Sequence, residues 1–149
     1  MSDRNSLVDT ELSRHTFTVE RGKIRELALA IGDDNPVYTD PEYARSLGYR
    51  DVIAPPTFGT CIDLWGGLDF MELCRKLQLN PVNVLHGGQD YEYYGAIYPG
   101  DVIEACSVLK KQLHKSKMSI LILETTYRNQ NGDTVLTCRK TIIERGQVQ

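Results

Sequence analysis

The sequence predicts an α+β fold in which an antiparallel sheet of about five strands curls around a long central helix. Three observations lead to this prediction. Apolar residues follow a helical period early in the chain, a stretch before its middle is apolar on nearly every side, and the second half alternates β-forming residues with turn signals. A helix that is apolar nearly all round must be covered, and a sheet with helices gathered on one face covers it.

The N-terminal region predicts an arm, a strand and a helix. Residues 1–14 lack periodicity and turn signals, so we expect a flexible arm there and a single domain over residues 15–149. The β-forming residues 16–19 (TFTV) predict a short strand. From Ile24 the apolar residues fall at i, i+3, i+4 and i+7, which is one face of a helix. Gly32 is suited to end that helix in the left-handed conformation.

A second, short helix is expected over residues 39–48. Thr39 with Glu42 matches a capping box, and Asp40 before Pro41 is an equally good cap. With either residue as the cap, the helix begins directly after the polar stretch at residues 32–38.

The central helix is expected to begin after two consecutive prolines. From Thr57 onward the residues are densely apolar, which predicts a largely buried helix. A break is expected at Gly66–Gly67, with residues 70–77 as a separate helical turn.

Four strands are expected in the second half of the chain, because β-forming residues alternate with hairpin turn signals. Their expected ranges are about 82–95, 102–113, 118–128 and 133–144. Met118–Glu124 (MSILILE) is almost continuously apolar, so its strand is expected at the centre of the sheet, covered on both faces for part of its length. A sheet wrapped around a helix in this way is the hot dog fold. Its open edge predicts a dimer through edge-to-edge pairing.

Composition excludes several classes of protein. The chain has 149 residues, of which 41% are apolar and 25% charged, with a net charge of −3. Nothing in this balance points to nucleic acid. No 18-residue apolar window predicts a membrane span, and the polar N-terminus does not resemble a signal peptide. We therefore expect no membrane or nucleic-acid partner and a cytoplasmic location.

The cysteines do not predict a metal site. Cys61, Cys74, Cys106 and Cys138 form no C-x-x-C pair, and the three histidines do not cluster with them. We expect reduced thiols that pack as small residues, with no metal and no cofactor.

A polar stretch at residues 32–38 (GDDNPVY) is the main candidate for chemistry. On spacing alone it is a turn, because Asn-Pro starts turns and Asp and Asn bond their own backbone. The stretch also resembles the overhanging segment of the MaoC-like dehydratase family. These are hot dog (R)-specific enoyl-CoA hydratases and 3-hydroxyacyl-thioester dehydratases. Residues 51–60 and 84–101 resemble the central helix start and next strand of the FAS1-like, or N-terminal MaoC-like, dehydratase subgroup, and the likeness covers roughly residues 15–144.

The resemblance implies a catalytic position at Asp33 and at residue 38. In catalytic members the motif is G-D-x-N-P-x-H, and its Asp and His supply the acid and the base that hydration of an enoyl thioester needs. This chain keeps Asp33 but has Tyr38 at the His position, and a phenol with a pKa of about 10 is a poor base. In the resembled subgroup such a hot dog cradles the acyl chain while a partner supplies Asp and His.

The resemblance also implies where a thioester binds. Backbone N–H groups at the start of the central helix would stabilise the enolate charge, and Gly59 would permit close approach. The substrate-binding residues expected on this basis are Asn35, Pro56, Thr57, Phe58, Gly59, Thr60 and His86. The expected ligand is an acyl thioester of CoA or acyl carrier protein, in fatty acid metabolism. The expected assembly is a homodimer or a heterodimer with a His-bearing MaoC-like subunit.

Two other functions remain open at this stage. The chain is alternatively a non-catalytic homodimer that binds acyl thioesters, or, with less support, a hot dog thioesterase. A thioesterase would need a carboxylate near the central helix, where Asp63 and Asp69 are available. Asp63 stands among apolar residues, a setting that raises a carboxyl pKa.

The remaining polar positions favour structural roles. His86 is expected within the sheet or at a dimer interface, while His15 and His114 are expected to be solvated. A group of tyrosines predicts a strand face that is also suited to lining an acyl tunnel. These are Tyr91, Tyr93, Tyr94 and Tyr98.

Overall fold

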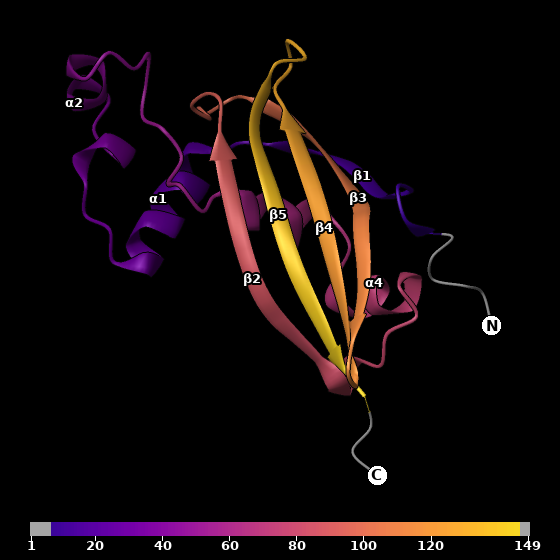
Figure 1. The fold of residues 1–149 in the computed structure, drawn as a ribbon. Helices are drawn as coiled ribbons and strands as arrows, with labels where there is room; N and C mark the ends of the chain where they lie inside the picture. Colours follow the sequence, from indigo (N-terminus) through magenta and orange to yellow (C-terminus); the bar gives the residue numbers. More distant parts are fainter. Residues whose placement is uncertain (1–6, 147–149) are drawn as a thin grey trace.

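A computed structural model of the chain describes residues 7–146 and confirms the α+β hot dog fold (Figure 1). One antiparallel sheet has the strand order β1-β3-β4-β5-β2. The strands are β1 (Glu11–Thr18), β2 (Val84–Tyr93), β3 (Val102–Lys115), β4 (Met118–Arg128) and β5 (Thr134–Arg145). The α-helices are α1 (Arg21–Ile31), α2 (Pro41–Ser46), α3 (Gly59–Gly66) and α4 (Phe70–Lys76), and the short 3-10 helices are η2 (Pro36–Tyr38) and η3 (Pro81–Asn83).

The central strand is the one that the sequence predicts. β4 lies between β3 and β5, and alternate residues from Leu121 to Tyr127 are buried against the helices. The expected cover on both faces is wrong for the described residues, because Ile120 and Ile122 on the other face are only partly buried. Figure 1 shows α3 and α4 behind this sheet, so the helical layer covers one face alone.

The central helix is shorter than expected and is divided. α3 ends at Gly66 and α4 begins at Phe70, which confirms the break at Gly66–Gly67. The expected burial on nearly every side is wrong, since Leu64 and Trp65 are 71% and 70% exposed. The sheet covers only one side of α3 in this single chain. No helix among the described residues has the length and apolar character to cross a membrane.

The N-terminal strand begins earlier than expected. Residues 11–14 lie in β1, paired with β3, so they do not belong to a flexible arm. Leu12 is buried in an apolar cluster formed with α4, β3, β4 and β5, and Leu7 and Val8 pack on the same cluster. The polar residues beside Leu12 conceal the alternation in the sequence. Residues 1–6 of the predicted arm lie outside the described residues.

The ends of the first two helices follow from local chemistry. Gly32 ends α1 at φ 71°, in the left-handed conformation that was expected. Asp40, rather than Thr39, caps α2, because its side chain accepts the N–H groups of Glu42 and Tyr43 at 2.8 and 3.1 Å. These caps place the segment between α1 and α2 beside the start of α3.

Gly67→Ala is expected to lower the free energy of unfolding by about 1–3 kcal/mol. A Cβ at this position would lie 2.6 Å from the backbone oxygen of Asp63, which holds the last turn of α3. Urea titration measures the change. Gly22→Ala, in α1, is the matched control, because no atom lies within 4 Å of its added Cβ. Its stability should stay equal or rise slightly, and equal losses in both variants would contradict this account.

Candidate functional site

The predicted motif forms two successive turns. A carboxylate oxygen of Asp33 accepts the N–H of Asn35 at 3.1 Å. The side-chain oxygen of Asn35 in turn accepts the N–H of Val37 at 3.0 Å and begins η2. Both side chains thus stabilise the backbone in the way that Asp and Asn do in turns generally.

Tyr38, at the end of η2, is 7% exposed. Burial raises its pKa above the usual value, and the negative charge of Asp33 acts in the same direction. The phenol therefore stays protonated at neutral pH. It can donate a hydrogen bond or pack against a ligand, but it cannot serve as a general base.

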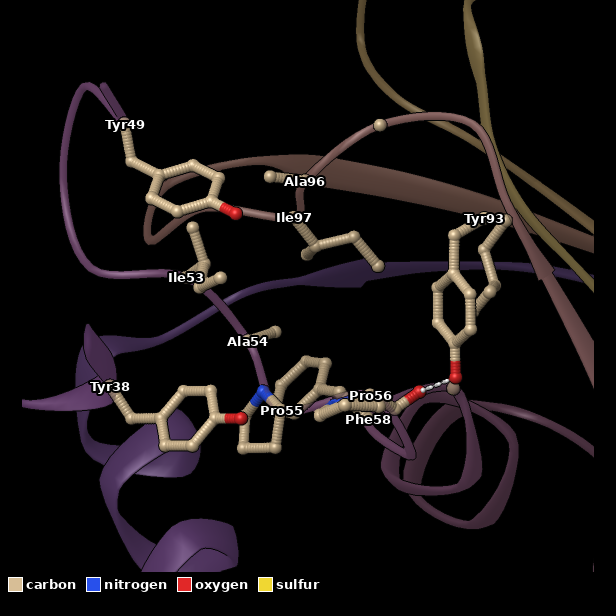
Figure 2. A pocket seen from close by; sticks show the side chains of 13 residues that line it. Tyr38, Tyr49, Ile53, Ala54, Pro55, Pro56, Phe58, Tyr93, Ala96 and Ile97 are labelled. Atoms are coloured by element: carbon tan, nitrogen blue, oxygen red, sulfur yellow. Dashed lines mark hydrogen bonds between the residues drawn. The ribbon is translucent and has the colours of Figure 1, made fainter. Parts of the chain in front are cut away.

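An apolar cavity of about 340 Å³ lies beside Tyr38, and we call it the overhang pocket. Figure 2 shows its walls, which come from residues 49–56, the start of α3 and the segment that follows β2. The lining residues are Tyr38, Tyr49, Ile53, Ala54, Pro55, Pro56, Phe58, Gly59, Tyr93, Gly95, Ala96, Ile97 and Leu136. A concave, mostly apolar site of this kind suits an acyl chain.

The start of α3 offers fewer free donors than expected. The N–H groups of Phe58, Thr60 and Cys61 each donate to the carbonyl oxygen three residues earlier, at 2.9, 3.0 and 2.9 Å. Among the N–H groups of residues 58–61, only that of Gly59 has no hydrogen bond to residues 7–146. Gly59 also lines the overhang pocket, so one backbone donor remains near a bound ligand.

The residues expected to bind substrate do not all gather in one place. Pro56, Phe58 and Gly59 line the overhang pocket with Tyr38. Asn35 and Thr57 are exposed and lie outside its lining. Thr60 and His86 instead line a second hollow of about 310 Å³ between α3, α4 and β2, which we call the side groove.

A chain of polar side chains crosses the side groove. His86, exposed on β2, contacts Gln89 at 3.1 Å through its Nε2 atom. The amide nitrogen of Gln89 donates to the hydroxyl of Tyr91, which is 2.7 Å from that of Thr60. Burial raises the pKa of Tyr91 to about 12. Sequence reasoning missed Gln89, although its two-residue spacing from Tyr91 puts both on one face of a strand.

The two carboxylates considered for thioester hydrolysis have structural partners. Asp63 accepts a hydrogen bond from Tyr127 at 2.8 Å and pairs with Lys140 at 3.1 Å. Asp69 caps α4 by accepting the N–H of Glu72 at 2.8 Å. Both oxygens of Asp63 are thus occupied, which leaves it poorly suited to act as a nucleophile or base. The partners Lys140 and Tyr127 are far from Asp63 in sequence and were not predicted.

Lys140→Met is expected to lower the free energy of unfolding by about 2 kcal/mol. The side chains of Lys140 and Asp63 are 26% and 14% exposed, and loss of the lysine leaves a largely buried carboxylate without its cation. Thermal and urea unfolding measure the effect. Lys110→Met is the control, since Lys110 lies 3.5 Å from an exposed Asp9 and should change stability little. Equal stability of the two variants would contradict this prediction.

His15 is not solvated as predicted. It lies in β1, and its Nε2 atom is 3.1 Å from the carbonyl oxygen of Ile62 in α3. An added Cβ at Gly66 would come within 2.6 Å of its ring, so glycine at this position lets α3 approach β1. The histidine was expected to be solvated because β1 was expected to begin one residue later.

The positions of His114 and Tyr93 agree better with the expectations. His114 is exposed at the end of β3, where its Nδ1 atom is 3.1 Å from Ser119 Oγ. Tyr93 is 54% exposed, lines the overhang pocket and donates to the carbonyl oxygen of Pro56 at 2.8 Å. Within the described residues no group of three or more His, Cys, Asp or Glu side chains is placed to hold a metal.

Comparison with known families decides the relationship. The family model for the FAS1-like, dehydratase domain region matches residues 6–138. The chain belongs to the FAS1-like dehydratase family. Relatives of this chain include a UPF0336 protein of Streptomyces avermitilis, 35% identical over 129 residues, covering 87% of this chain and 85% of the relative. A UPF0336 protein of Thermobifida fusca is 35% identical over 130 residues with the same coverage.

Solved structures share the fold of this FAS1-like chain. The HadBC (3R-hydroxyacyl-ACP dehydratase) complex of Mycobacterium tuberculosis matches with a TM-score of 0.75 and 23% identity, over 86% of this chain and 89% of the other. The ChsH1-ChsH2 complex of the same organism matches with a TM-score of 0.80 and 16% identity, over 98% of this chain and 90% of the other. The R-hydratase PhaJ1 of Pseudomonas aeruginosa matches with a TM-score of 0.68 and 18% identity, over 94% of this chain and 83% of the other. These likenesses place the chain among MaoC-like hot dog folds.

Proposed function

We propose that this chain is the acyl-holding member of an (R)-specific enoyl-thioester hydratase, which in reverse is a 3-hydroxyacyl-thioester dehydratase. The observation that carries the proposal is the position of Tyr38. It stands where the family motif has His, is buried beside an apolar pocket, and has a raised pKa. The chain keeps a pocket for an acyl group but lacks the imidazole.

The proposed division of work follows from the chemistry of hydration. A base removes a proton from water, the hydroxide oxygen bonds to the β-carbon, and a proton is returned to the α-carbon. Asp33 is near Tyr38 but does not line the overhang pocket, and it has no imidazole with which to share these two transfers. In this proposal the partner supplies an Asp and a His, and this chain positions the acyl group in the overhang pocket.

The side groove and the edge of β2 are the proposed contact surface for that partner. β2 pairs only with β5, so its other edge is open to another chain, and open edges favour such pairing. The adjoining groove exposes Leu64 (71%), Phe70 (51%) and Leu85 (45%). Apolar surface beside an open edge suits a second hot dog subunit. The HadBC and ChsH1-ChsH2 structures are complexes in this fold class, which supports the proposal.

Crotonyl-CoA hydration tests the proposed function. The chain should be assayed alone and together with a MaoC-like subunit that carries G-D-x-N-P-x-H. We expect negligible turnover alone and at least about 10²-fold more in the mixture than either protein shows, because general acid–base groups contribute on that scale. Strong turnover by the chain alone would contradict the proposal. Acyl-CoA binding without turnover in any pairing would favour the non-catalytic acyl-binding homodimer instead.

A further inference from the structure

The overhang pocket contains very few polar side-chain atoms. Of the residues that line it, only Tyr38, Tyr49 and Tyr93 carry one, in each case a phenol hydroxyl. The remaining lining side chains are aliphatic, proline, phenylalanine or glycine. Any side-chain hydrogen bond to a ligand in this pocket must therefore come from one of three tyrosines.

One of the three hydroxyls makes a hydrogen bond within the protein, and a second lies near a carboxylate. Tyr93 donates to the carbonyl oxygen of Pro56 at 2.8 Å, as the dashed line in Figure 2 marks. The negative charge of Asp33 acts on the hydroxyl of Tyr38 and, with burial, raises its pKa, so the two groups lie near each other. Neither is available to a ligand without loss of an interaction that the protein already makes.

Tyr49 is different, because its hydroxyl has no hydrogen bond to any residue between 7 and 146. Figure 2 shows its ring reaching across the pocket toward Ala96 and Ile97, on the side away from Pro56 and Phe58. The hydroxyl thus lies on the side of the pocket formed by Ala96 and Ile97. Tyr49 is half-buried, so its hydroxyl is open to water or to a ligand, and a ligand oxygen placed there would accept or donate a hydrogen bond.

We propose that Tyr49 makes the overhang pocket selective for acyl groups that carry a hydroxyl or keto oxygen on the chain beyond the β-carbon. This inference rests on the proposed function, in which the pocket holds the acyl chain. The thioester end lies toward Gly59 at the start of α3, and the chain oxygen lies near the hydroxyl of Tyr49. A site that hydrogen-bonds a substrate oxygen discriminates against the analogue that lacks it.

Binding of matched thioesters tests the proposal. Calorimetric titration compares octanoyl-CoA with octanoyl-CoA derivatives that carry one hydroxyl or keto group at successive carbons beyond the β-carbon. For at least one derivative, Tyr49→Phe should lower affinity by about fivefold to tenfold, the equivalent of one uncharged hydrogen bond. Affinity for octanoyl-CoA itself should stay within about twofold, because the ring is retained.

Tyr93→Phe is the matched control, since it also removes one hydroxyl from the pocket lining, but one that the protein already uses. It should leave unchanged the ratio of the affinity for the oxygenated derivative to the affinity for octanoyl-CoA. Tyr49→Met serves as a second variant if Tyr49→Phe does not fold, and it should also abolish the preference for the oxygenated chain.

The outcomes separate this inference from the function on which it rests. If octanoyl-CoA and its derivatives bind but the affinity ratio is the same in wild type and Tyr49→Phe, the selectivity proposal is overturned and the acyl-holding role stands. If no thioester binds the wild-type chain, alone or with its partner subunit, the proposed function fails and this inference fails with it.

Discussion

Tyr38→His is expected to raise the rate of crotonyl-CoA hydration by the isolated chain by about 10²-fold. The substitution restores the family motif on a segment whose Asp33 is already in place. An imidazole with a pKa near about 6.5 can act as a base at neutral pH where the phenol cannot. General acid–base groups usually contribute about 10²- to 10⁴-fold to the rate. We expect the low end of that range, because His is shorter than Tyr and the pocket is shaped by the larger ring.

Controls for this variant separate a new base from a change of shape. Tyr38→Phe alters the side chain without adding a base and should leave the rate at the background level. Adding Asp33→Asn to Tyr38→His should remove most of the gain. The gained rate should rise with pH through the pKa of the histidine, because the neutral imidazole is the active form. Equal rates in the His and Phe variants would show that position 38 does not hold a latent base site.

Ala96→Phe is expected to weaken binding of octanoyl-CoA by about tenfold to a hundredfold. Ala96 lines the overhang pocket and is partly exposed, so a larger ring there fills the space of the acyl chain without disturbing the core. Burial of each methylene contributes about 0.8 kcal/mol, and loss of about two to three methylene contacts produces a change of this size. Titration of octanoyl-CoA and butyryl-CoA measures it.

The chain-length dependence is the sharper part of that prediction. Butyryl-CoA should be affected much less than octanoyl-CoA, because fewer of its methylenes reach the blocked region. Ala30→Phe, at an exposed position in α1 outside the pocket, is the control and should leave both affinities unchanged. A uniform loss for both thioesters in Ala96→Phe would place the acyl chain elsewhere.

Much of the fold was predictable because it depends on local pattern. The apolar run Met118–Glu124 predicted the central strand, and the glycine pair at Gly66–Gly67 predicted the break between α3 and α4. Gly32 and Asp40 act at helix ends for reasons of backbone conformation and capping. Each of these signals needs only neighbouring residues to be understood.

The incorrect predictions concern contacts that are distant in sequence. β1 was expected to start after His15, because the polar residues around Leu12 hide a strand that forms by pairing with β3. Asp63 was considered as a catalytic carboxylate, but its partners Lys140 and Tyr127 come from β5 and β4. Spacing in the sequence does not show such pairings, since they depend on the register of the sheet.

The candidate site was predictable only in part. Tyr38, Pro56, Phe58 and Gly59 line one pocket, because the segment after α1 and the start of α3 meet there. Thr60, the next residue along α3, instead lines the side groove, and its hydroxyl is 2.7 Å from that of Tyr91. The seven-residue motif at residues 32–38 thus ends at a residue that lines this pocket, while the direction of each side chain depends on the packing of α3.

The central claim is that this chain binds an acyl thioester without hydrating it. The most direct test titrates trans-2-octenoyl-CoA into the purified chain by calorimetry and then analyses the same mixture by chromatography. The account predicts saturable binding and recovery of the enoyl thioester unchanged. Conversion to 3-hydroxyoctanoyl-CoA at a rate that Asp33→Ala abolishes would contradict it and make Tyr38 a participant in catalysis.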